Sequence, residues 1–259
     1  MIQHFSHTGG RETNEDKEII YCDKNLILIG ICDGHGGNKT ASYISKTMPL
    51  IFKSNEIKIP LDKNQIKKVF LNIQKQFKTD KKFKYTYESG CTCSMVLIKD
   101  EFFYTINVGD SRSVACFYNE KTNKVIIKQL TIDHKPYNYD EKQRILKAGG
   151  TVINDEGIER INGLSLSRAF GDCDSEQTPP IPDIKQYKIT DNLKFIIVAC
   201  DGIFDVLTNE QVCNFILQQN YDKNMKLKEN KKKTAEEVCK LAIQNLTTDN
   251  VSCIIVFFK

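Results

Sequence analysis

Apolar residues gather in short runs that are rich in β-branched side chains, a pattern typical of buried strands. The runs cover residues 19–21, 26–32, 95–98, 102–108, 125–130, 195–200 and 253–258. We predict a strand at each of these places.

A second spacing predicts amphipathic helices between the strands. Apolar side chains recur every three or four residues and so share one helix face, as do Ile66, Val69, Phe70, Ile73 and Phe77. Asp62 is a plausible N-cap for this helix, and another helix is expected to open at Asn38.

Three further helices are indicated by their ends. Thr208 with Gln211 and Thr234 with Glu237 have the spacing of capping boxes, which mark helix N-termini. A shorter helix over residues 141–147 is expected to stop at two glycines, 149 and 150, because glycine tolerates the positive φ of a C-terminal cap.

The order of these elements favours an α+β fold. Strands come in clusters joined by short links such as 99–101, and helices come in pairs, which is unlike strict βαβ alternation. We therefore predict an antiparallel β-sandwich with helices packed outside it. No internal repeat is visible, and we expect one domain over residues 1–259.

Composition indicates a globular protein with a sizeable core, since 40% of the 259 residues are hydrophobic and 27% are charged. No apolar stretch approaches the roughly 20 residues of a membrane span, and the first ten residues are too polar for a signal peptide. We expect no membrane association and an intracellular protein, in the cytoplasm and also in the nucleus.

Ten cysteines are present, yet none forms a CxxC pair. Several lie inside apolar runs, which favours buried, reduced thiols over disulfides: Cys22, Cys32, Cys116, Cys200 and Cys253. The net charge of +4 comes largely from a lysine-rich segment within residues 221–233. Such a segment is more often a solvated loop than a nucleic-acid site, so no nucleic-acid partner is expected.

Acidic residues stand beside glycine where three of the predicted strands end. They form Asp33-Gly34, Gly109-Asp110 and Asp201-Gly202, while Asp249 opens the last strand. A carboxylate at a strand end has a rigid support, and glycine allows backbone or ligand to approach closely, which suits a metal ligand. Each pair alone is more typical of a turn than of a metal site, but the repetition favours a metal site.

Ligand chemistry narrows the choice of metal. With four histidines and no CxxC, the chain offers little to zinc, and the calcium-binding loop pattern is absent. Oxygen ligands then favour Mg²⁺ or Mn²⁺, which commonly act on phosphate esters. The Walker motif is missing and no cysteine has an arginine six residues later, which leaves hydrolysis by a metal-activated water.

Eight motifs in order resemble the metal-dependent serine/threonine protein phosphatases of type 2C. They are Gly10-Arg11-x-x-Asn14-Glu15-Asp16, Asp33-Gly34-His35-Gly36-Gly37, Val108-Gly109-Asp110-Ser111-Arg112, Leu130-Thr131-x-Asp133-His134-Lys135-Pro136, Ala148-Gly149-Gly150, Ser167-Arg168-Ala169-x-Gly171-Asp172, Cys200-Asp201-Gly202-x-x-Asp205-Val206 and Asp249-Asn250. The resemblance implies a four-layer αββα catalytic domain that acts as a monomer on phosphorylated proteins. It also implies hydrolysis of phosphoserine and phosphothreonine by a hydroxide that bridges two metal ions.

The same resemblance implies roles for single residues. Asp33 matches the carboxylate that bridges both metals, and the Gly34 carbonyl matches a further ligand. Asp201 and Asp249 match ligands of one metal, and Glu15 matches the acid of the other.

Further matches concern a third ion and the substrate. Asp110 and Asp205 match acids that hold a third metal in some members. Arg11 matches the phosphate-binding arginine, whose planar fork donates to two oxygens, and His35 matches a proposed general acid.

For other residues in the motifs we expect structural roles. Asp16 is expected to face away or cap a turn, and His134 and the block 167–172 are expected to support nearby loops. The segment near 172–183, where the family carries a substrate-facing flap, is short and contains three prolines. Gly90-Cys91-Thr92 replaces the family's Gly-Ser-Thr, which core packing should tolerate.

Two alternatives from other classes stay open on sequence alone. The chain could be a catalytically silent, phosphatase-like binding or regulatory module, although its expected signature, loss of a metal-binding acid, is absent. Nucleic-acid binding through the lysine-rich segment lacks interleaved aromatic residues beyond Tyr221.

Overall fold

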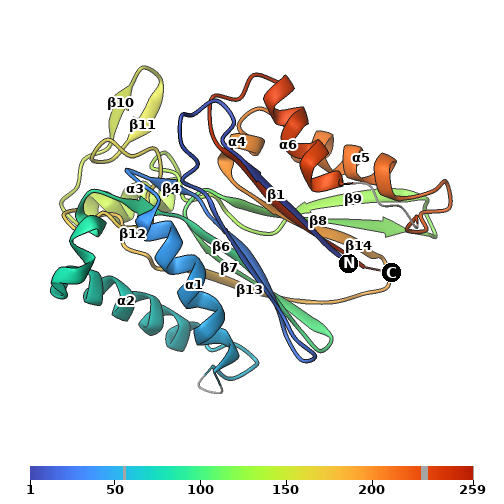
Figure 1. Ribbon diagram of the computed structural model, residues 1–259, viewed down its shortest axis with the longest axis horizontal. Coiled ribbons are helices and arrows are strands. Elements are labelled where there is room, and N and C mark those ends of the chain that lie inside the picture. Colours follow the sequence, from blue (N-terminus) through green and yellow to red (C-terminus); the bar gives the residue numbers. More distant parts are fainter. Residues whose placement is uncertain (55–56, 229–232, 259) are drawn as a thin grey trace.

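Two five-stranded antiparallel sheets lie face to face in the middle of the molecule, and helices cover their outer faces (Figure 1). The computed structural model describes residues 1–54, 57–228 and 233–258. Layer by layer, the order is helices, sheet, sheet, helices. This confirms the predicted α+β sandwich.

The strands pair with antiparallel neighbours in both sheets. The first sheet has the order β13-β7-β6-β3-β2, and its strands are β2 (Lys17–Cys22), β3 (Ile27–Cys32), β6 (Cys93–Lys99), β7 (Phe102–Val108) and β13 (Asp183–Lys188). The second has the order β1-β15-β14-β8-β9, with β1 (Ile2–His7), β8 (Arg112–Asn119), β9 (Lys124–Gln129), β14 (Leu193–Ala199) and β15 (Val251–Phe257).

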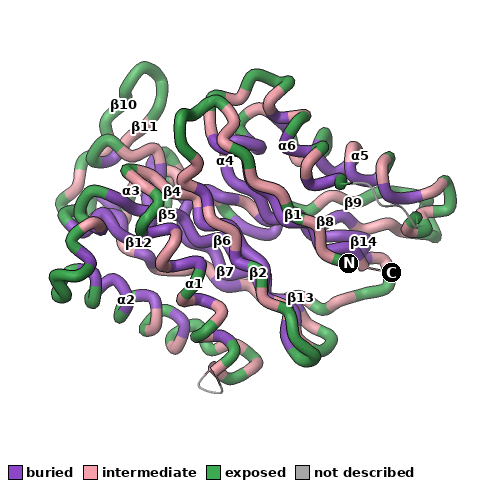
Figure 2. Tube along the Cα trace, in the orientation of Figure 1, coloured by how far each residue is buried: buried purple, intermediate pink, exposed green. Residues whose placement is uncertain are grey.

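Smaller strands sit at one end of the sandwich. A short sheet joins β12 (Phe170–Gly171), β5 (Gly90–Cys91) and β4 (Gly34–His35), and a hairpin joins β10 (Ile153–Asp155) to β11 (Ile158–Arg160). Figure 2 shows this hairpin as a largely exposed projection, in contrast to the buried central strands.

The central strands are buried on both faces, as β14 illustrates. Its Ile196 and Val198 belong to the core between the two sheets, while Ile197 and Ala199 pack toward the helices on the outer face. A strand covered on both sides has no polar face, so its sequence is apolar throughout. The apolar runs predicted as strands owe their composition to this double burial.

Helices close the sandwich on both sides. α1 (Lys39–Lys53) and α2 (Lys63–Thr79) cover the first sheet, followed by the 3₁₀ helix η1 (Lys81–Tyr87). The short α4 (Asp201–Phe204) with α5 (Asn209–Asn220) and α6 (Thr234–Gln244) covers the second. α3 (Tyr139–Lys147) lies near the β10–β11 hairpin (Figure 1).

All the strands predicted from apolar runs are present, but β1, β8 and β13 of the two large sheets were missed. β1 carries His and Ser between its apolar residues, and β13 is a half-exposed edge strand, where polar residues are permitted. β8 lies inside its sheet, but it begins with Arg112 and the buried Ser113, which shorten its apolar run.

Of the N-terminal caps predicted at Asp62, Thr208 and Thr234, the first two are confirmed and the third is wrong. Asp62 caps α2 by accepting from the backbone N–H of Asn64 at 2.8 Å, and the capping box of Thr208 and Gln211 opens α5. The Thr234 box was wrong: Thr234 is the first residue of α6, and its hydroxyl is hydrogen-bonded to the side chain of Asn220. The hydrogen bond with Asn220 therefore occupies the Thr234 hydroxyl that a capping box would have used.

The cysteines are all free thiols, as expected, and nine of them are buried. Cys22 is the exception, because β2 ends there at an exposed turn. Among the described residues, no helix has both the length and the apolar character required to cross a membrane.

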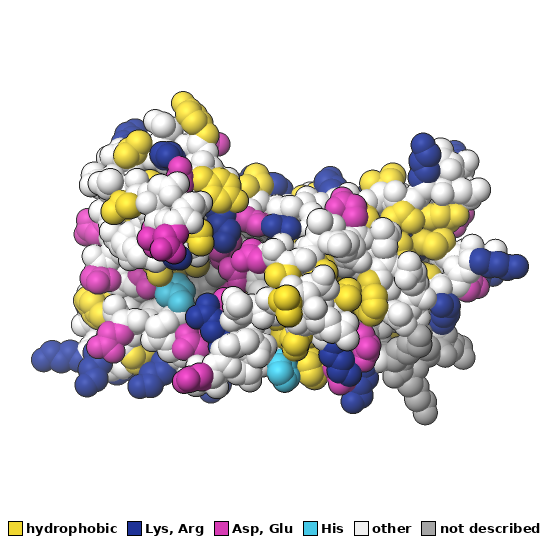
Figure 3. Space-filling model, turned by 90° about the horizontal axis from the view of Figure 1, so that it is seen from above, with side chains coloured by type: hydrophobic (Ala, Val, Ile, Leu, Met, Phe, Trp, Pro, Cys, Tyr) yellow, Lys and Arg dark blue, Asp and Glu magenta, His cyan; other side chains and the backbone are white. Residues whose placement is uncertain are grey.

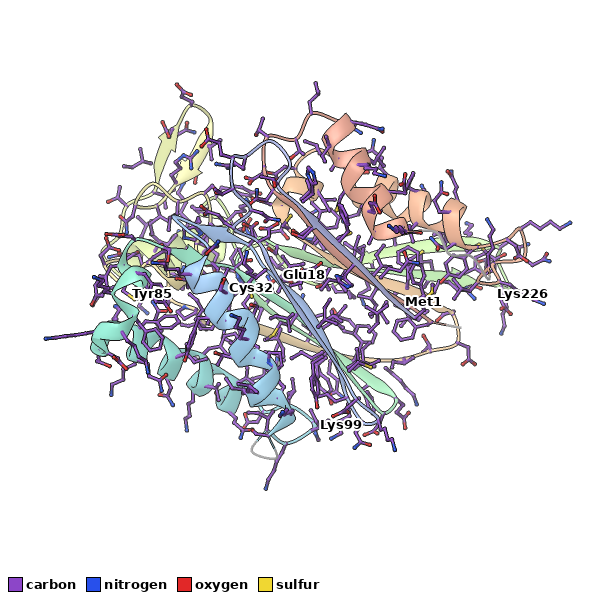
Figure 4. All side chains as sticks on the ribbon, viewed as in Figure 1. Met1, Glu18, Cys32, Tyr85, Lys99 and Lys226 are labelled. Atoms are coloured by element: carbon purple, nitrogen blue, oxygen red, sulfur yellow. The ribbon has the colours of Figure 1, made fainter. Side chains whose placement is uncertain are left out.

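The lysine-rich segment joins α5 to α6. Its Lys226, which Figure 4 labels, lies at an end of the molecule far from the β10–β11 hairpin. Lys223, Lys226 and Lys228 are exposed, in agreement with a solvated loop. Residues 229–232 of the predicted loop lie outside the described part of the chain.

Candidate active site

The acids singled out in the sequence meet at one end of the sandwich. Asp33 directly follows β3, Asp201 follows β14 by two positions, and Asp110 lies between β7 and β8. Glu15 precedes β2, and Asp249 precedes β15. Because strands are antiparallel, the end of one lies beside the start of its neighbour, so these positions share an edge.

A cavity of about 510 Å³ opens at this edge. Every predicted site residue except Asp205 lines it: Arg11, Glu15, Asp33, Gly34, His35, Asp110, Asp201 and Asp249. In the view of Figure 3, acidic side chains gather in a hollow with basic side chains around them. Figure 4 labels Cys32, which precedes Asp33, in the interior, and Lys99 at the far tip of the β6–β7 hairpin.

Two of the neighbouring glycines are required by close backbone approach. A Cβ on Gly34 would lie 2.5 Å from the carbonyl oxygen of Glu15, and one on Gly202 would lie 2.0 Å from that of Asn250. Neither distance can be accommodated without moving backbone. The glycines that follow Asp33 and Asp201 therefore allow the backbone segments that carry the acids to pack closely together.

Without a positive charge nearby, the buried carboxylates of the cluster repel one another when they are ionised. Burial, followed by repulsion from Asp16 and Asp201, raises the pKa of Asp33 well above its usual range. Burial and the nearby acids Asp110 and Asp205 do the same to the pKa of Asp201. Carboxylates placed this way favour binding of cations, which would restore ionisation.

Asp16 belongs to this cluster, so the prediction that it faces away was wrong. It is 3% exposed, and its carboxylate, that of Asp33 and the thiol of Cys200 have atoms within 4.8 Å of one another. Burial raises its pKa to about 6, and its Oδ1 has no hydrogen-bond partner in the described structure. The sequence could not show this, since either acid of a Glu-Asp pair can point inward.

The donor set fits divalent cations that prefer oxygen ligands. Asp33, Asp201, Asp249 and Glu15 provide carboxylate oxygens, and the Gly34 carbonyl is a further oxygen on the same wall. Glu15 is oriented by the backbone N–H of Gly37, which donates to its Oε2 at 3.0 Å.

Asn250 fastens the N-terminal loop to the cluster. Its Oδ1 accepts from the Glu15 N–H at 2.8 Å, and its Nδ2 donates to the carbonyls of Thr8 and Thr13 at 2.7 and 2.9 Å. One side chain next to Asp249 thus positions the loop that carries Arg11 and Glu15. This explains the Asp-Asn pair found in the sequence.

Thr92 gives similar support beneath Asp33. Its Oγ1 accepts from the Asp33 N–H at 2.9 Å and is 2.7 Å from the hydroxyl of Ser111. Its neighbour Cys91 is fully buried in the core, in agreement with a packing role for this substituted position.

Arg11 lies at the cavity wall in contact with an acid. Its Nε donates to Asp249 Oδ1 at 3.1 Å and its Nη2 to Oδ2 at 2.7 Å, and this pair raises the pKa of Arg11. The planar guanidinium is therefore held in one orientation beside the cluster.

His35 is held by a residue that sequence reasoning did not assign to the site. Its Nε2 is 3.0 and 2.9 Å from the two carboxylate oxygens of Asp172. Asp172 belongs to the predicted supporting block 167–172, so that block reaches the site directly.

The residues matched to a third metal are arranged differently from the core acids. Asp110 Oδ2 accepts from Lys135 Nζ, which also lies 4.0 Å from Asp201 Oδ2. Burial by itself would lower the pKa of Lys135, but Asp110 and Asp201 outweigh it and raise that pKa. Asp205 interacts with the same lysine electrostatically from outside the cavity.

Residues 160–166, rather than the expected flap near 172–183, complete the cavity wall. Arg160, Gly163, Leu164, Ser165 and Leu166 line it. Segment 172–183 lies alongside, where Asp172, Asp174, Ser175 and Gln177 line a neighbouring hollow. The β10–β11 hairpin has only three residues in each strand, so no periodic signal announced it.

His134 has the structural role predicted for it. It is 1% exposed, its Nδ1 accepts from the Gly109 N–H at 3.0 Å, and its own N–H donates to the Gly109 carbonyl at 3.0 Å. It ties its loop to the turn that carries Asp110.

Comparison with known proteins agrees with this geometry. The family model described as protein phosphatase 2C matches residues 4–251. The chain belongs to the protein phosphatase 2C family. This is a family of metal-dependent serine/threonine phosphatases, so the predicted family and enzyme class are confirmed.

Curated protein phosphatase 2C relatives cover most of the chain. A probable protein phosphatase 2C 4 of Paramecium tetraurelia is 32% identical over 82% of this chain and 75% of its own length. The human integrin-linked kinase-associated serine/threonine phosphatase 2C is 31% identical over 96% of this chain and 70% of its own.

Solved structures show the same fold. A serine-threonine phosphatase 2C from Toxoplasma gondii matches all of this chain and 94% of its own, with a TM-score of 0.81 at 20% identity. A C. elegans sex determining protein matches all of this chain and 65% of its own, with a TM-score of 0.84 at 23% identity.

A buried acid of α3 braces the protein phosphatase 2C cavity wall. Glu141 is 4% exposed and accepts from Arg168 Nη2, from Arg144 Nη2 at 3.0 Å and from the Ser167 hydroxyl at 2.6 Å. Burial alone would raise the pKa of Glu141, but these donors lower it to about 2. Ser167 directly follows the wall segment 160–166.

Replacing Glu141 should therefore change how the free energy of unfolding depends on pH. Because folding lowers the pKa of Glu141 from 4.5 to about 2, the ionised side chain stabilises the folded state above pH 4.5. This stabilisation is lost as the pH falls toward 2. We expect Glu141→Gln to lower the free energy of unfolding at pH 7 by about 3 kcal/mol, with the difference shrinking below about pH 4.5. Urea denaturation at several pH values measures it.

Asp155→Asn is the matched control, because the Asp155 carboxylate pairs with Arg160 while 61% exposed. It should change the free energy of unfolding by less than about 1 kcal/mol. A pH-independent difference between Glu141→Gln and the wild type would contradict an ionised Glu141 in the folded state.

Proposed function

We propose that the chain hydrolyses phosphoserine and phosphothreonine in proteins with the help of two Mg²⁺ or Mn²⁺ ions. The observation that carries this proposal is the convergence of Glu15, Asp33, Asp201 and Asp249 on one cavity beside Arg11. We further propose that the chain acts as a monomeric, single catalytic domain in the cytoplasm and also in the nucleus.

The family resemblance divides the acids between two ions. Asp33 would contact both ions, with the Gly34 carbonyl as a further ligand, while Asp201 and Asp249 would hold one ion and Glu15 the other. Bound there, the cations would supply a polarised water for attack on phosphorus. The chain itself provides the rigid placement of the ligands through Asn250, Thr92 and Gly37.

Arg11 is suited to bind the phosphoryl group next to these ions. Its contact with Asp249 orients the guanidinium, and a carboxylate oxygen has lone pairs left for a cation. A planar fork that donates to two phosphate oxygens would fix the phosphorus in the cavity and offset charge that develops during transfer.

His35 is suited to protonate the departing oxygen. Serine and threonine leave as alkoxides, which are poor leaving groups, so delivery of a proton should assist them. The Asp172 carboxylate at 2.9 Å from His35 Nε2 would hold the ring in one orientation. His35 lines the cavity, and its contact with Asp172 connects β4 to the loop after β12.

Loss of the central acid should abolish hydrolysis without loss of the fold. We expect Asp33→Asn to reduce kcat/KM on a phosphothreonine peptide by at least about 10²- to 10³-fold, because the ligand between the two ions loses its charge. Initial rates in Mn²⁺ measure the loss, and circular dichroism checks the fold. Asp191→Asn, an exposed acid remote from the cavity residues, serves as the control.

Full activity of Asp33→Asn would reject the site. A wild-type chain that binds Mn²⁺ yet hydrolyses neither a phosphopeptide nor an aryl phosphate would instead be the silent, phosphatase-like module.

The role of His35 can be separated from binding by the choice of leaving group. We expect His35→Gln to lower kcat by about 10²-fold or more on phosphoserine peptides, yet far less on p-nitrophenyl phosphate, whose leaving group needs no proton. Equal losses on both substrates would contradict the general-acid role.

A further inference from the structure

Lys135 places a positive charge among the acids matched to a third metal ion. Its Nζ donates to Asp110 Oδ2 and lies 4.0 Å from Asp201 Oδ2. The Lys135 side chain is 15% exposed and that of Asp110 only 2%, so water screens this pair little. The charge of Asp205 also acts on the same ammonium group.

The backbone around Lys135 is fixed, so the ammonium position is built into the fold. His134 is bonded to Gly109 through both its backbone N–H and its ring, each at 3.0 Å. Asp133 accepts from Arg112 Nη2 at 2.6 Å. Residues 133 and 134 thus tie the backbone just before Lys135 to the turn that carries Asp110.

Lys135 is placed to neutralise acids rather than to hold substrate. Within the part of the chain that the structure describes, it does not belong to the cavity lining, whereas Arg11 and Arg160 do. A divalent ion shared by Asp110, Asp201 and Asp205 would lie close to the Lys135 ammonium group on Asp110 Oδ2, and the two positive charges would repel each other.

We propose that the ammonium group of Lys135 is a built-in counter-cation at the third site. The chain then binds two divalent ions tightly and admits a third only when Lys135 leaves Asp110. This inference rests on the proposed function, since it presumes the two-ion site. It assigns Lys135 as a positioning residue that sets how many metal ions the enzyme holds.

Removing the charge of Lys135 should open the third site. Mn²⁺ binding is measured by equilibrium dialysis and by the electron paramagnetic resonance of free Mn²⁺, with no substrate present. For Lys135→Gln, whose amide can still donate to Asp110, we expect a third Mn²⁺ to bind at least about tenfold more tightly than in the wild type. Lys135→Met should give the same gain.

Two variants provide matched controls. Lys135→Arg keeps the charge and should leave the third affinity weak, and Lys121→Met removes an exposed lysine elsewhere and should change nothing. Lys135→Gln combined with Asp110→Asn should lose the gained site, because the carboxylate that binds the ion is gone.

The outcomes separate this inference from the proposed function. A wild-type chain that binds no Mn²⁺ would contradict the two-ion site itself. Two tight ions in the wild type, with an unchanged third affinity in both Lys135→Gln and Lys135→Met, would overturn the role of Lys135 alone. A gain in Lys135→Arg equal to that in Lys135→Gln would show that shape rather than charge blocks the site, and would also overturn it.

Discussion

Repulsion among carboxylates at one end of the sandwich is the constraint around which the site is organised. Asp33 and Asp201 are crowded by burial and by neighbouring acids, and their pKa values are raised for that reason. A fold gains nothing in stability from such a cluster by itself. The arrangement becomes favourable when cations bind, so the energetic cost of the acids and the chemistry proposed for them have the same origin.

The structure holds the cluster together with contacts that are mostly uncharged. Asn250 and Thr92 use neutral hydrogen bonds to fix the backbone of Glu15 and Asp33, and Gly34 and Gly202 allow carbonyls to approach where any side chain would collide. Two cations contact acids of the site directly: Arg11 pairs with Asp249, and Lys135 pairs with Asp110.

Much of this could be read from the sequence, for physical reasons. Doubly buried strands are rich in apolar residues, so β3 and β14 were visible, and Asp33 and Asp201 could be placed just after their ends. The pairing of His35 with Asp172 spans 137 positions, and no local pattern encodes it. For the same reason the hold of Lys135 on Asp110 and the wall formed by residues 160–166 required the structure. The family, and with it the protein substrate class, came from ordered motifs rather than from composition.

The central claim is that the clustered carboxylates form a binding site for two Mg²⁺-class ions. A crystal soaked in Mn²⁺, with anomalous density measured at the cavity, tests it most directly. Two strong peaks are expected, one in contact with Asp33, Asp201 and Asp249 and the other with Asp33, Glu15 and the Gly34 carbonyl. An absence of anomalous density at these residues, or peaks at other carboxylates only, would contradict it.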